Sequence, residues 1–503
     1  MLKKIITLIF AGLLTLTAFP ACNAGEVDDS EGTLNIFMLE GGFGTDFMEE
    51  WIKAFKAIEG NEDIVVNYYY DVEASTKATN YLANPSENPY DLFLTGGIGF
   101  KAQAETGNLV DISDVYENFE NPLREEFADM GKYNDKYYMV PWASGPCGLV
   151  YNTELLPESL VPNTTDELIQ LCKDIKAGNV ETARDVAPLV WAGKNAGDYW
   201  QYVTDVWWAQ YEGLVNYYNF WSLNNNDPNG YTVYGQEGIL KSYEVLQQLL
   251  NKSNGYSLHG SDTKEHTPAQ TNFMQGQAVM IPVGDWLENE MKESYSDVTN
   301  YKLMKTPVIS AIGKELELAG SGATDAQHDE KLSSIVEMVD GGKTVSEIAE
   351  ETGIDESKIT IVYEARNIIT NIGANHQAYI PAQSNAIEEA KAFLTFMSSE
   401  EANRIFREYA HASQPYVYDT QYTAETPYMQ SKDEISEECV FLTPMYDSSS
   451  IRYKAGLAKW NKISDVEKQL YNSTTTAQAF YEANYNFFTS AGENRWDYYY
   501  SRR

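Results

Sequence analysis

Cysteine and basic residues are both scarce in this sequence of 503 residues. There are 4 Cys, and Cys22 lies beside an N-terminal apolar segment, so the remaining three cannot all form pairs. We therefore expect no disulfide framework. Lys and Arg number 36 against 74 Asp and Glu, which gives a net charge of −38. A surface of that sign repels phosphate groups, which argues against nucleic-acid binding and against docking on anionic lipid through a basic patch.

Motifs of metal, nucleotide and nucleophilic sites are missing as well. The 5 His lack zinc-binding spacing, and there is no G-x-S-x-G motif and no Gly-rich loop ending in Gly-Lys-Ser/Thr. Residues 225–236 partly match a calcium loop, but Gln236 stands where a bidentate Glu is needed. A plain turn at 227–230 explains that pattern better. We expect no cofactor and no metal.

Long apolar runs are confined to the N-terminus. Two lysines precede an apolar stretch at 5–18, and the tetrapeptide FPAC follows, ending at Cys22. A basic start and a short apolar core are typical of a secretion signal. Cys22 after a small residue resembles a bacterial lipobox, which predicts a signal peptide at 1–21, a lipid on Cys22 and a polar, flexible tether at 22–32. Phe19 stands where the lipobox usually has Leu, so ordinary signal cleavage stays open.

Aromatic residues, by contrast, are abundant. They make up 13% of the chain, with 36 Tyr and 10 Trp, and the densest stretch is 199–221. Tyr and Trp suit both cores and sugar-contacting surfaces, because each combines an apolar ring with a polar group. The length predicts two or three folded units at roughly 100–200 residues per domain.

Strand and helix patterns alternate near the N-terminus. An apolar run at 34–38 precedes Phe47, Trp51, Phe55 and Ile58, which recur at helical spacing. A β-rich run, a helical stretch and another apolar run follow at 64–70, 73–82 and 91–94. This order predicts an open α/β sheet with right-handed crossovers. Ligands of such sheets bind beyond the carboxyl ends of the strands, here at 40–45, 71–73 and 95–98.

Four later segments carry ordered motifs. Residues 131–152 carry a Gly-Lys-Tyr hairpin turn and a Y-N strand, and they resemble the pattern G-K-x-Y-x-x-P. Residues 162–168 match P-x-T-x-x-E-L and predict a helix start, at which Thr164 or Thr165 can cap. Residues 273–280 match F-x-x-G-x-A-x-M, a Gly-x-Trp motif follows at 284–286, and 378–406 match A-x-x-F-x-x-F-x-S-x-E. In this order they resemble the extracellular solute-binding proteins of bacterial ABC importers, in the carbohydrate-binding family that includes maltose-binding protein.

The resemblance implies a periplasmic-binding-protein-like α/β fold of two lobes, each a mixed sheet flanked by helices, with hinge strands between them. The lobes close on the ligand, and the membrane permease recognises the closed form. It implies a monomeric, non-enzymatic protein at the extracellular face of the cell membrane, attached through the N-terminal lipid only. The aromatic content favours an oligosaccharide ligand.

The lobes are expected to be discontinuous in sequence. The first would comprise 33–142 and about 301–398, and the second 143–300 and about 399–503. Residues 323–373 are long and helical in pattern where the family often has a short connection. We expect a helical insertion there, with no function assigned.

Sugar sites combine aromatic platforms with planar polar groups that bind hydroxyls. Trp286 is the strongest candidate, because it matches the stacking Trp of the family's Gly-x-Trp; the alternative is a core Trp. Asp285 beside it would accept sugar hydroxyls or instead cap a helix. Tyr199 and Trp200 occupy a position that faces the cleft in the family, although many of the aromatics after them must be core.

The remaining candidates for the sugar site are chosen for their expected place in the fold. Trp142 sits where the family crosses between lobes. Phe43 and Glu40 lie on the first strand-to-helix loop, which sheet topology places at the cleft. Tyr446 could supply a late aromatic ring from the second lobe, by analogy.

Other functions stay open beside the binding protein. Two carboxylates at strand ends would suffice for a cell-surface glycoside hydrolase. An all-helical, TPR-based glycan-capturing lipoprotein would have a similar size and signal. A polyamine is a further ligand class, because acidic and aromatic groups also bind amines.

Overall fold

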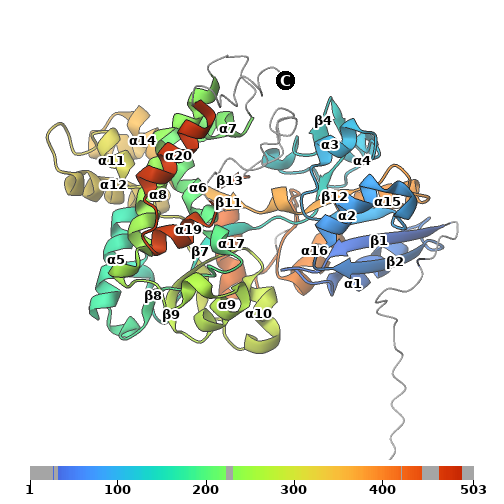
Figure 1. Cartoon of the computed structure of the whole chain (residues 1–503), viewed down its shortest axis with the longest axis horizontal. Helices are drawn as coiled ribbons and strands as arrows, with labels where there is room; N and C mark the ends of the chain where they lie inside the picture. The colour runs from blue at the N-terminus through green and yellow to red at the C-terminus, as the bar shows by residue number, and fades with distance from the viewer. Residues whose placement is uncertain (1–26, 28–31, 223–229, 421, 444–463, 490–503) are drawn as a thin grey trace, which may run out of the picture.

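The computed structural model describes residues 27, 32–222, 230–420, 422–443 and 464–489. The chain forms two lobes that lie side by side, each with a mixed sheet and surrounding helices (Figure 1). This confirms the predicted two-lobe α/β fold class. Within those ranges, no helix has the length and apolar character needed to cross a membrane.

The first sheet has the strand order β2-β1-β3-β12-β6. β1 (Thr33–Leu39) runs parallel to β2 (Val65–Asp71) and β3 (Leu92–Thr95). β12 (Gln377–Tyr379) is antiparallel to β3 and to β6 (Val140–Pro141). β1 is buried along nearly its whole length, as its continuous apolar run predicts for a central parallel strand.

The register of this sheet fixes where its loops emerge. Ile36 of β1 lies opposite Tyr68 of β2 and Leu92 of β3. Because the three strands are parallel, their carboxyl ends meet at one edge. The loop at 40–46 leaves the sheet at that edge.

Helices pack around this sheet. α1 (Phe47–Lys56) buries Phe47, Trp51 and Phe55, as their spacing predicted, and packs against α16 (Glu400–Ala410). Ile58 of the same series lies beyond the end of the helix and is exposed. The Trp51 indole Nε1 donates a hydrogen bond to the Ala402 carbonyl at 2.8 Å. The lobe also contains α2 (Ala74–Ala83), α3 (Phe100–Glu105), α4 (Ser113–Glu117), α15 (Ile387–Phe396) and the predicted hairpin of β4 (Lys132–Tyr133) and β5 (Lys136–Tyr137).

The second sheet has the order β13-β11-β7-β9-β8, and β10 also pairs with β7. β7 is its centre, antiparallel to β9, β10 and β11. Its strands are β7 (Pro146–Asn152), β8 (Ala187–Leu189), β9 (Ala278–Val283), β10 (Tyr301–Leu303), β11 (Ile368–Asn371) and β13 (Val440–Leu442).

The helices of the second lobe bury most of the aromatic stretch. Trp207, Trp208 and Tyr217 are all at most 1% exposed. Of the two cap candidates Thr164 and Thr165, the Thr164 side chain caps α5 by accepting from the Glu167 amide. The helices are α5 (Thr165–Ala177), α6 (Gln201–Glu212), α7 (Leu214–Ser222), α8 (Glu237–Leu250), α9 (His266–Met274), α10 (Leu287–Tyr295), α17 (Pro427–Glu438), α19 (Val466–Tyr471) and α20 (Ala477–Thr489).

The predicted insertion is helical. Two of its helices start with capping boxes, at Thr324 and Thr344, in which the side chain binds the third amide of the helix. The Arg366 guanidinium binds Asp340 at 2.6 Å and ties two of the helices together. The helices of the insertion are α12 (Asp325–Asp340), α13 (Val345–Thr352) and α14 (Glu356–Arg366), and α11 (Ala311–Glu315) precedes it.

The chain is shared between the lobes differently from the predicted boundaries. β10 pairs with β7, and the insertion packs in the hydrophobic core of the second lobe, although 301–398 was assigned to the first. α16 packs on α1, although residues from 399 onward were assigned to the second. The sequence pattern identifies a helix or strand, but it does not identify the sheet against which that element packs.

Candidate functional site

Aromatic rings of both lobes meet at the carboxyl edge of the first sheet. Phe43, on the loop between β1 and α1, is 3% exposed. Its ring centroid lies 6.1 Å from Trp142, 6.2 Å from Trp286 and 5.0 Å from His376, spacings typical of favourable ring contacts. We name these rings and their neighbours the interlobe aromatic cluster; its members are Phe43, Trp142, Tyr199, Tyr202, Trp286, His376 and Phe406.

Strand ends position the first-lobe members. Trp142 follows β6, and its amide donates to the His376 carbonyl at 3.1 Å. Its indole Nε1 donates to the carbonyl of Thr95 at the end of β3, at 3.3 Å. His376 directly precedes β12. Three strand ends of one sheet therefore hold these two rings, and Phe43 packs on both of them.

The second-lobe members surround Trp286, which follows β9 and starts α10. Tyr199 lies on a 3₁₀ turn at Gly197–Trp200, and Tyr202 lies on α6. Their ring centroids are 5.7 and 6.4 Å from that of Trp286. Trp286 is 9% exposed, and its indole N–H has no hydrogen-bond partner among the described residues.

Trp286 also lies against the backbone of the first-lobe loop. A Cβ added to Gly42 would lie 2.6 Å from Cβ of Trp286 and 2.8 Å from its Cδ2, so only glycine fits there in this arrangement. The Asn289 amide of α10 donates to the Gly42 carbonyl at 2.7 Å. Lys292 Nζ lies 3.1 Å from Asp46 and 3.1 Å from the Tyr409 carbonyl. The two lobes are thus in direct contact at this loop.

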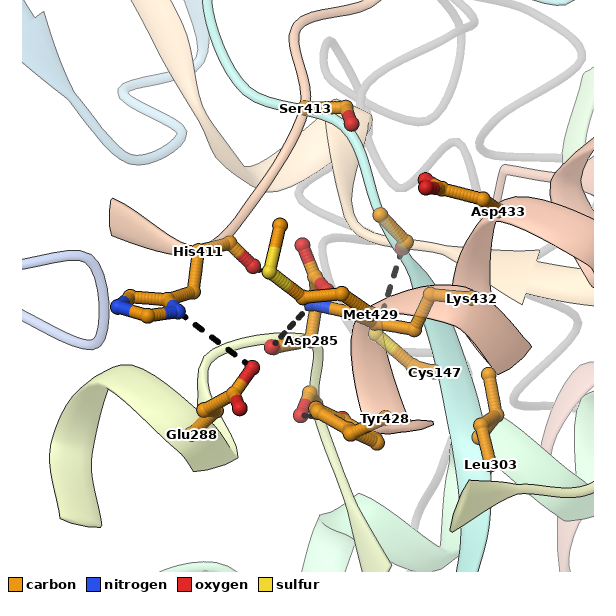
Figure 2. Close-up of polar contacts among 12 residues, drawn as sticks. Cys147, Asp285, Glu288, Leu303, His411, Ser413, Tyr428, Met429, Lys432 and Asp433 are labelled. Carbon is orange, nitrogen blue, oxygen red and sulfur yellow. Dashed lines mark hydrogen bonds and ion pairs between the residues drawn. The ribbon is translucent and has the colours of Figure 1, made fainter. Parts of the chain in front are cut away.

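A buried ion pair lies directly before Trp286 in the sequence. The Asp285 and Lys432 side chains are 1% and 6% exposed, and the Lys432 ammonium donates to Asp285 Oδ1 (Figure 2). It also donates to the carbonyls of Asp285, at 3.2 Å, and His411, at 2.7 Å. Burial raises the pKa of Asp285, while the Lys432 ammonium acts in the opposite direction.

Two further titratable groups, Glu288 beside the cluster and His376 within it, have shifted pKa values. Burial acts to raise the pKa of Glu288, but hydrogen bonding to His411 and the charge of Lys432 lower it overall. Nδ1 of His411 lies 3.6 Å from Oε2 of Glu288 (Figure 2). Burial lowers the pKa of His376 to about 4, so this ring of the cluster is neutral at pH 7.

The structure brings four of the predicted site residues together: Trp286, Tyr199, Trp142 and Phe43. Trp286 and Tyr199 contribute from the second lobe, whereas Phe43 and Trp142 contribute from the first. Trp142 is 1% exposed and lies behind Phe43, so it supports the cluster from beneath.

The other described candidates lie apart from the cluster. Trp200 is fully buried in the core of the second lobe. Asp285 is paired with Lys432 and lines a polar cavity of about 200 Å³ beside the segment at 144–146. Glu40 is exposed at the start of its loop, and its amide binds the Asp71 carbonyl.

Several predictions fall outside the described residues. They concern Tyr446, Cys22, the signal and tether, and residues 225–229 of the calcium-like loop. In the ranges that are described, no group of three or more His, Cys, Asp and Glu side chains could hold a metal ion.

Three members of the cluster were missed from the sequence. Tyr202 follows Tyr199 at helical spacing, so that signal was present. Phe406 was noted only as the end of the segment 378–406, which carries a sequence motif of the family. His376 carried no signal, because its place depends on β12 joining the first sheet from a position late in the chain.

Comparison with known proteins identifies a family and several relatives. The family model described as bacterial extracellular solute-binding protein matches residues 50–417. The chain is 25% identical over 229 residues to the diacetylchitobiose binding protein DasA of Streptomyces coelicolor, across 43% of this chain and 48% of that protein. It is 27% identical over 186 residues to the multiple sugar-binding protein of Streptococcus mutans, across 34% of this chain and 39% of that protein. The chain thus aligns with half or less of the length of these relatives.

Solved structures share the fold over nearly the whole chain. A chitin oligosaccharide binding protein superposes with a TM-score of 0.61 at 15% identity, covering 93% of this chain and 99% of that one. The solute-binding protein RafE in complex with raffinose superposes with a TM-score of 0.60 at 17% identity, covering 92% and 99%. At these identities the likeness concerns the fold.

Proposed function

Because the chain belongs to the bacterial extracellular solute-binding protein family, we propose that it captures an oligosaccharide between its lobes and delivers it to the permease of an ABC importer. The observation that carries this proposal is the interlobe aromatic cluster, in which rings of both lobes meet at Trp286. Pyranose rings present apolar faces that pack on aromatic rings. A sugar held there contacts both lobes at once.

Contact with both lobes is what favours closure. A ligand shifts the equilibrium between open and closed forms only by its difference in affinity for the two forms. In the open form a sugar contacts the rings of one lobe, whereas in the closed form it contacts the rings of both. In the structure, Phe43 and the backbone of Gly42 rest on Trp286. A sugar therefore enters when the lobes part, and it packs beside the contact of Gly42 with Trp286, against rings of both lobes.

This mechanism assigns different roles to the predicted residues. Trp286 and Tyr199 stack on the sugar from the second lobe, and Phe43 packs on it from the first, with Trp142 supporting Phe43. Glu40, exposed at the mouth, is available for a hydroxyl group. We assign no direct sugar contact to Asp285 or Trp200, which are buried elsewhere, and Tyr446 remains a prediction from the sequence.

The finer location and the state of assembly are also proposals. The family is extracellular, and we assign a lipid to Cys22, supported by the basic start, the apolar core and the small residue before the cysteine. The protein then works as a monomer held at the membrane by this lipid alone. Labelling of cells with a fatty-acid analogue should mark the wild type but not Cys22→Ser, which should escape into the medium.

A thermal-shift screen over oligosaccharides tests the proposed function. A true ligand at 100 times its Kd should stabilise the protein by about 2.7 kcal/mol. A shift with spermidine and none with any glycan would contradict the sugar assignment. Steady release of reducing ends from the glycans would contradict the binding role.

Substitution of the stacking residue provides the matched test. Trp286→Ala removes the ring that contacts both lobes, so the glycan-induced shift should be much smaller at the same glycan concentration, although weak binding should remain measurable. Tyr363→Ala, on the outer surface of α14 at 37% exposure, should retain it. Equal shifts in the two variants would show that the sugar binds elsewhere.

A further inference from the structure

The Lys432 ammonium is buried with all of its hydrogen-bonding capacity used. An ammonium group has three donors. Here the three acceptors are Asp285 Oδ1, the Asp285 carbonyl and the His411 carbonyl. Figure 2 shows Lys432 reaching from α17 toward the turn that carries Asp285, with His411 on the other side.

A second residue of α17 holds the same turn. Tyr428 lies one helical turn before Lys432, so the two side chains share a face. Its hydroxyl donates to the Gly284 carbonyl at 3.3 Å, and the Lys432 ammonium lies 4.7 Å from its ring centroid. α17 therefore fixes the carbonyls of both residues that precede Trp286.

The third acceptor belongs to the other lobe. His411 ends α16 in a left-handed conformation with φ of 52°, and α16 packs on α1 of the first lobe. α17, in contrast, packs on β10 of the second lobe. One ammonium group thus joins the turn before Trp286 to the end of a first-lobe helix.

Stability alone gives a poor account of this pair. Desolvation of two charges offsets most of their attraction, so replacing a buried ion pair with uncharged residues of similar size is often neutral or stabilising. Glycine at 145 makes room for it, since a Cβ there would lie 2.6 Å from that of Asp285. The pair between Asp285 and Lys432 fixes the position of the turn before Trp286. A ring that stacks on a sugar, as proposed for Trp286, needs its position to be fixed in this way.

We propose that Lys432 is a positioning residue of the sugar site, which holds the turn at Gly284 and Asp285 so that Trp286 faces the first lobe, and which makes that placement depend on contact with His411. This inference rests on the proposed function for its effect on sugar binding. Its effect on the turn itself does not depend on any ligand.

The test removes both charges together. Lys432→Met alone leaves Asp285 buried without its partner and risks misfolding, so the principal variant is Lys432→Met with Asp285→Asn. Lys305→Met is the control, because Lys305 is also largely buried and paired, with Asp340 and Glu438, but lies away from Trp286. We expect the double variant to fold, with oligosaccharide affinity at least tenfold weaker, and the control to keep wild-type affinity.

Two readouts separate positioning from a general structural role. Amide hydrogen exchange of the peptide 283–291, without ligand, should be faster in the double variant and unchanged in the control. In a Trp286→Ala background, removal of the charges should cause no further loss of affinity, because the ring to be positioned is gone.

The outcomes distinguish the two proposals. Unchanged exchange at 283–291, or affinity losses that simply add to that of Trp286→Ala, would overturn the positioning role. Faster exchange in a protein whose wild type binds no glycan would support the positioning of the turn and contradict the proposed function instead.

Discussion

Gly42→Ala is the sharpest test of the contact between the first-lobe loop and Trp286. In the structure the added methyl would lie 2.6 Å from Cβ of Trp286 and closer still to the ring. Ordinary contacts begin near 3.4 Å, so the loop and the indole would have to separate by roughly 1 Å. Gly42 does not have a positive φ, so alanine adopts its backbone without strain. The clash therefore acts between lobes and leaves each lobe intact.

The size of the effect follows from the cost of overpacking. An extra methyl in a packed environment costs about 1–3 kcal/mol. If the ligand-bound form keeps this contact, the cost applies to that form alone, because the lobes of the free protein can part. Oligosaccharide affinity should then weaken about 5- to 150-fold, since about 1.4 kcal/mol corresponds to a tenfold change.

Calorimetric titration of both variants with the same sugar measures the effect. Gly41→Ala is the matched control, because its methyl meets only the flexible Leu39 side chain, at 3.3 Å. The melting temperature of each ligand-free variant should stay close to that of the wild type. If Gly42→Ala binds as tightly as Gly41→Ala, then the packing of this loop on Trp286 is not a feature of the loaded protein, and the reasoning fails.

The shifted pKa values of two buried groups, Asp205 and His376, should give opposite effects of pH on stability. Burial raises the pKa of Asp205 to about 7, so the folded state keeps a proton that the unfolded chain loses. Stability should fall by on the order of 4 kcal/mol from about pH 4 to pH 7, and Asp205→Asn should remove this component in urea unfolding at a series of pH values. The lowered pKa of His376 has the opposite effect on the pH dependence of stability. The free energy of unfolding should fall by on the order of 3 kcal/mol as pH drops from about 6.5 to about 4, because the unfolded chain takes up a proton that the folded state does not. His376→Gln should remove that loss, and a variant with the wild-type slope would refute the corresponding assignment.

The sequence predicted local structure and class well. Phe47, Trp51 and Phe55 identified α1 because a buried helical face repeats with the helical period. Thr164 identified the start of α5 because a capping side chain lies next in sequence to the amides it binds. Both patterns involve residues that are close in sequence, so they can be recognised without knowledge of the fold.

The arrangement of the site could be predicted only in part from the sequence. Trp286 and Phe43 were found because each follows a strand and so lies at a sheet edge. Trp200 was included beside Tyr199, yet the turn directs the two side chains to opposite sides, and only Tyr199 reaches Trp286. The partner of Asp285 could not be foreseen, because Lys432 lies 147 residues away and meets it only through the packing of α17.

The strand order of the two sheets has a consequence for how the protein assembles. The first sheet needs β12, at Gln377–Tyr379, and the second needs β13, at Val440–Leu442. Neither sheet can be completed until most of the polypeptide has been made, and both depend on pairings between distant segments, which form slowly. A fragment cut between the lobes would leave strand edges of both sheets unpaired. The protein is therefore expected to fold late and as one unit, and for an extracellular protein this delay prolongs the unfolded state in which a chain can be exported.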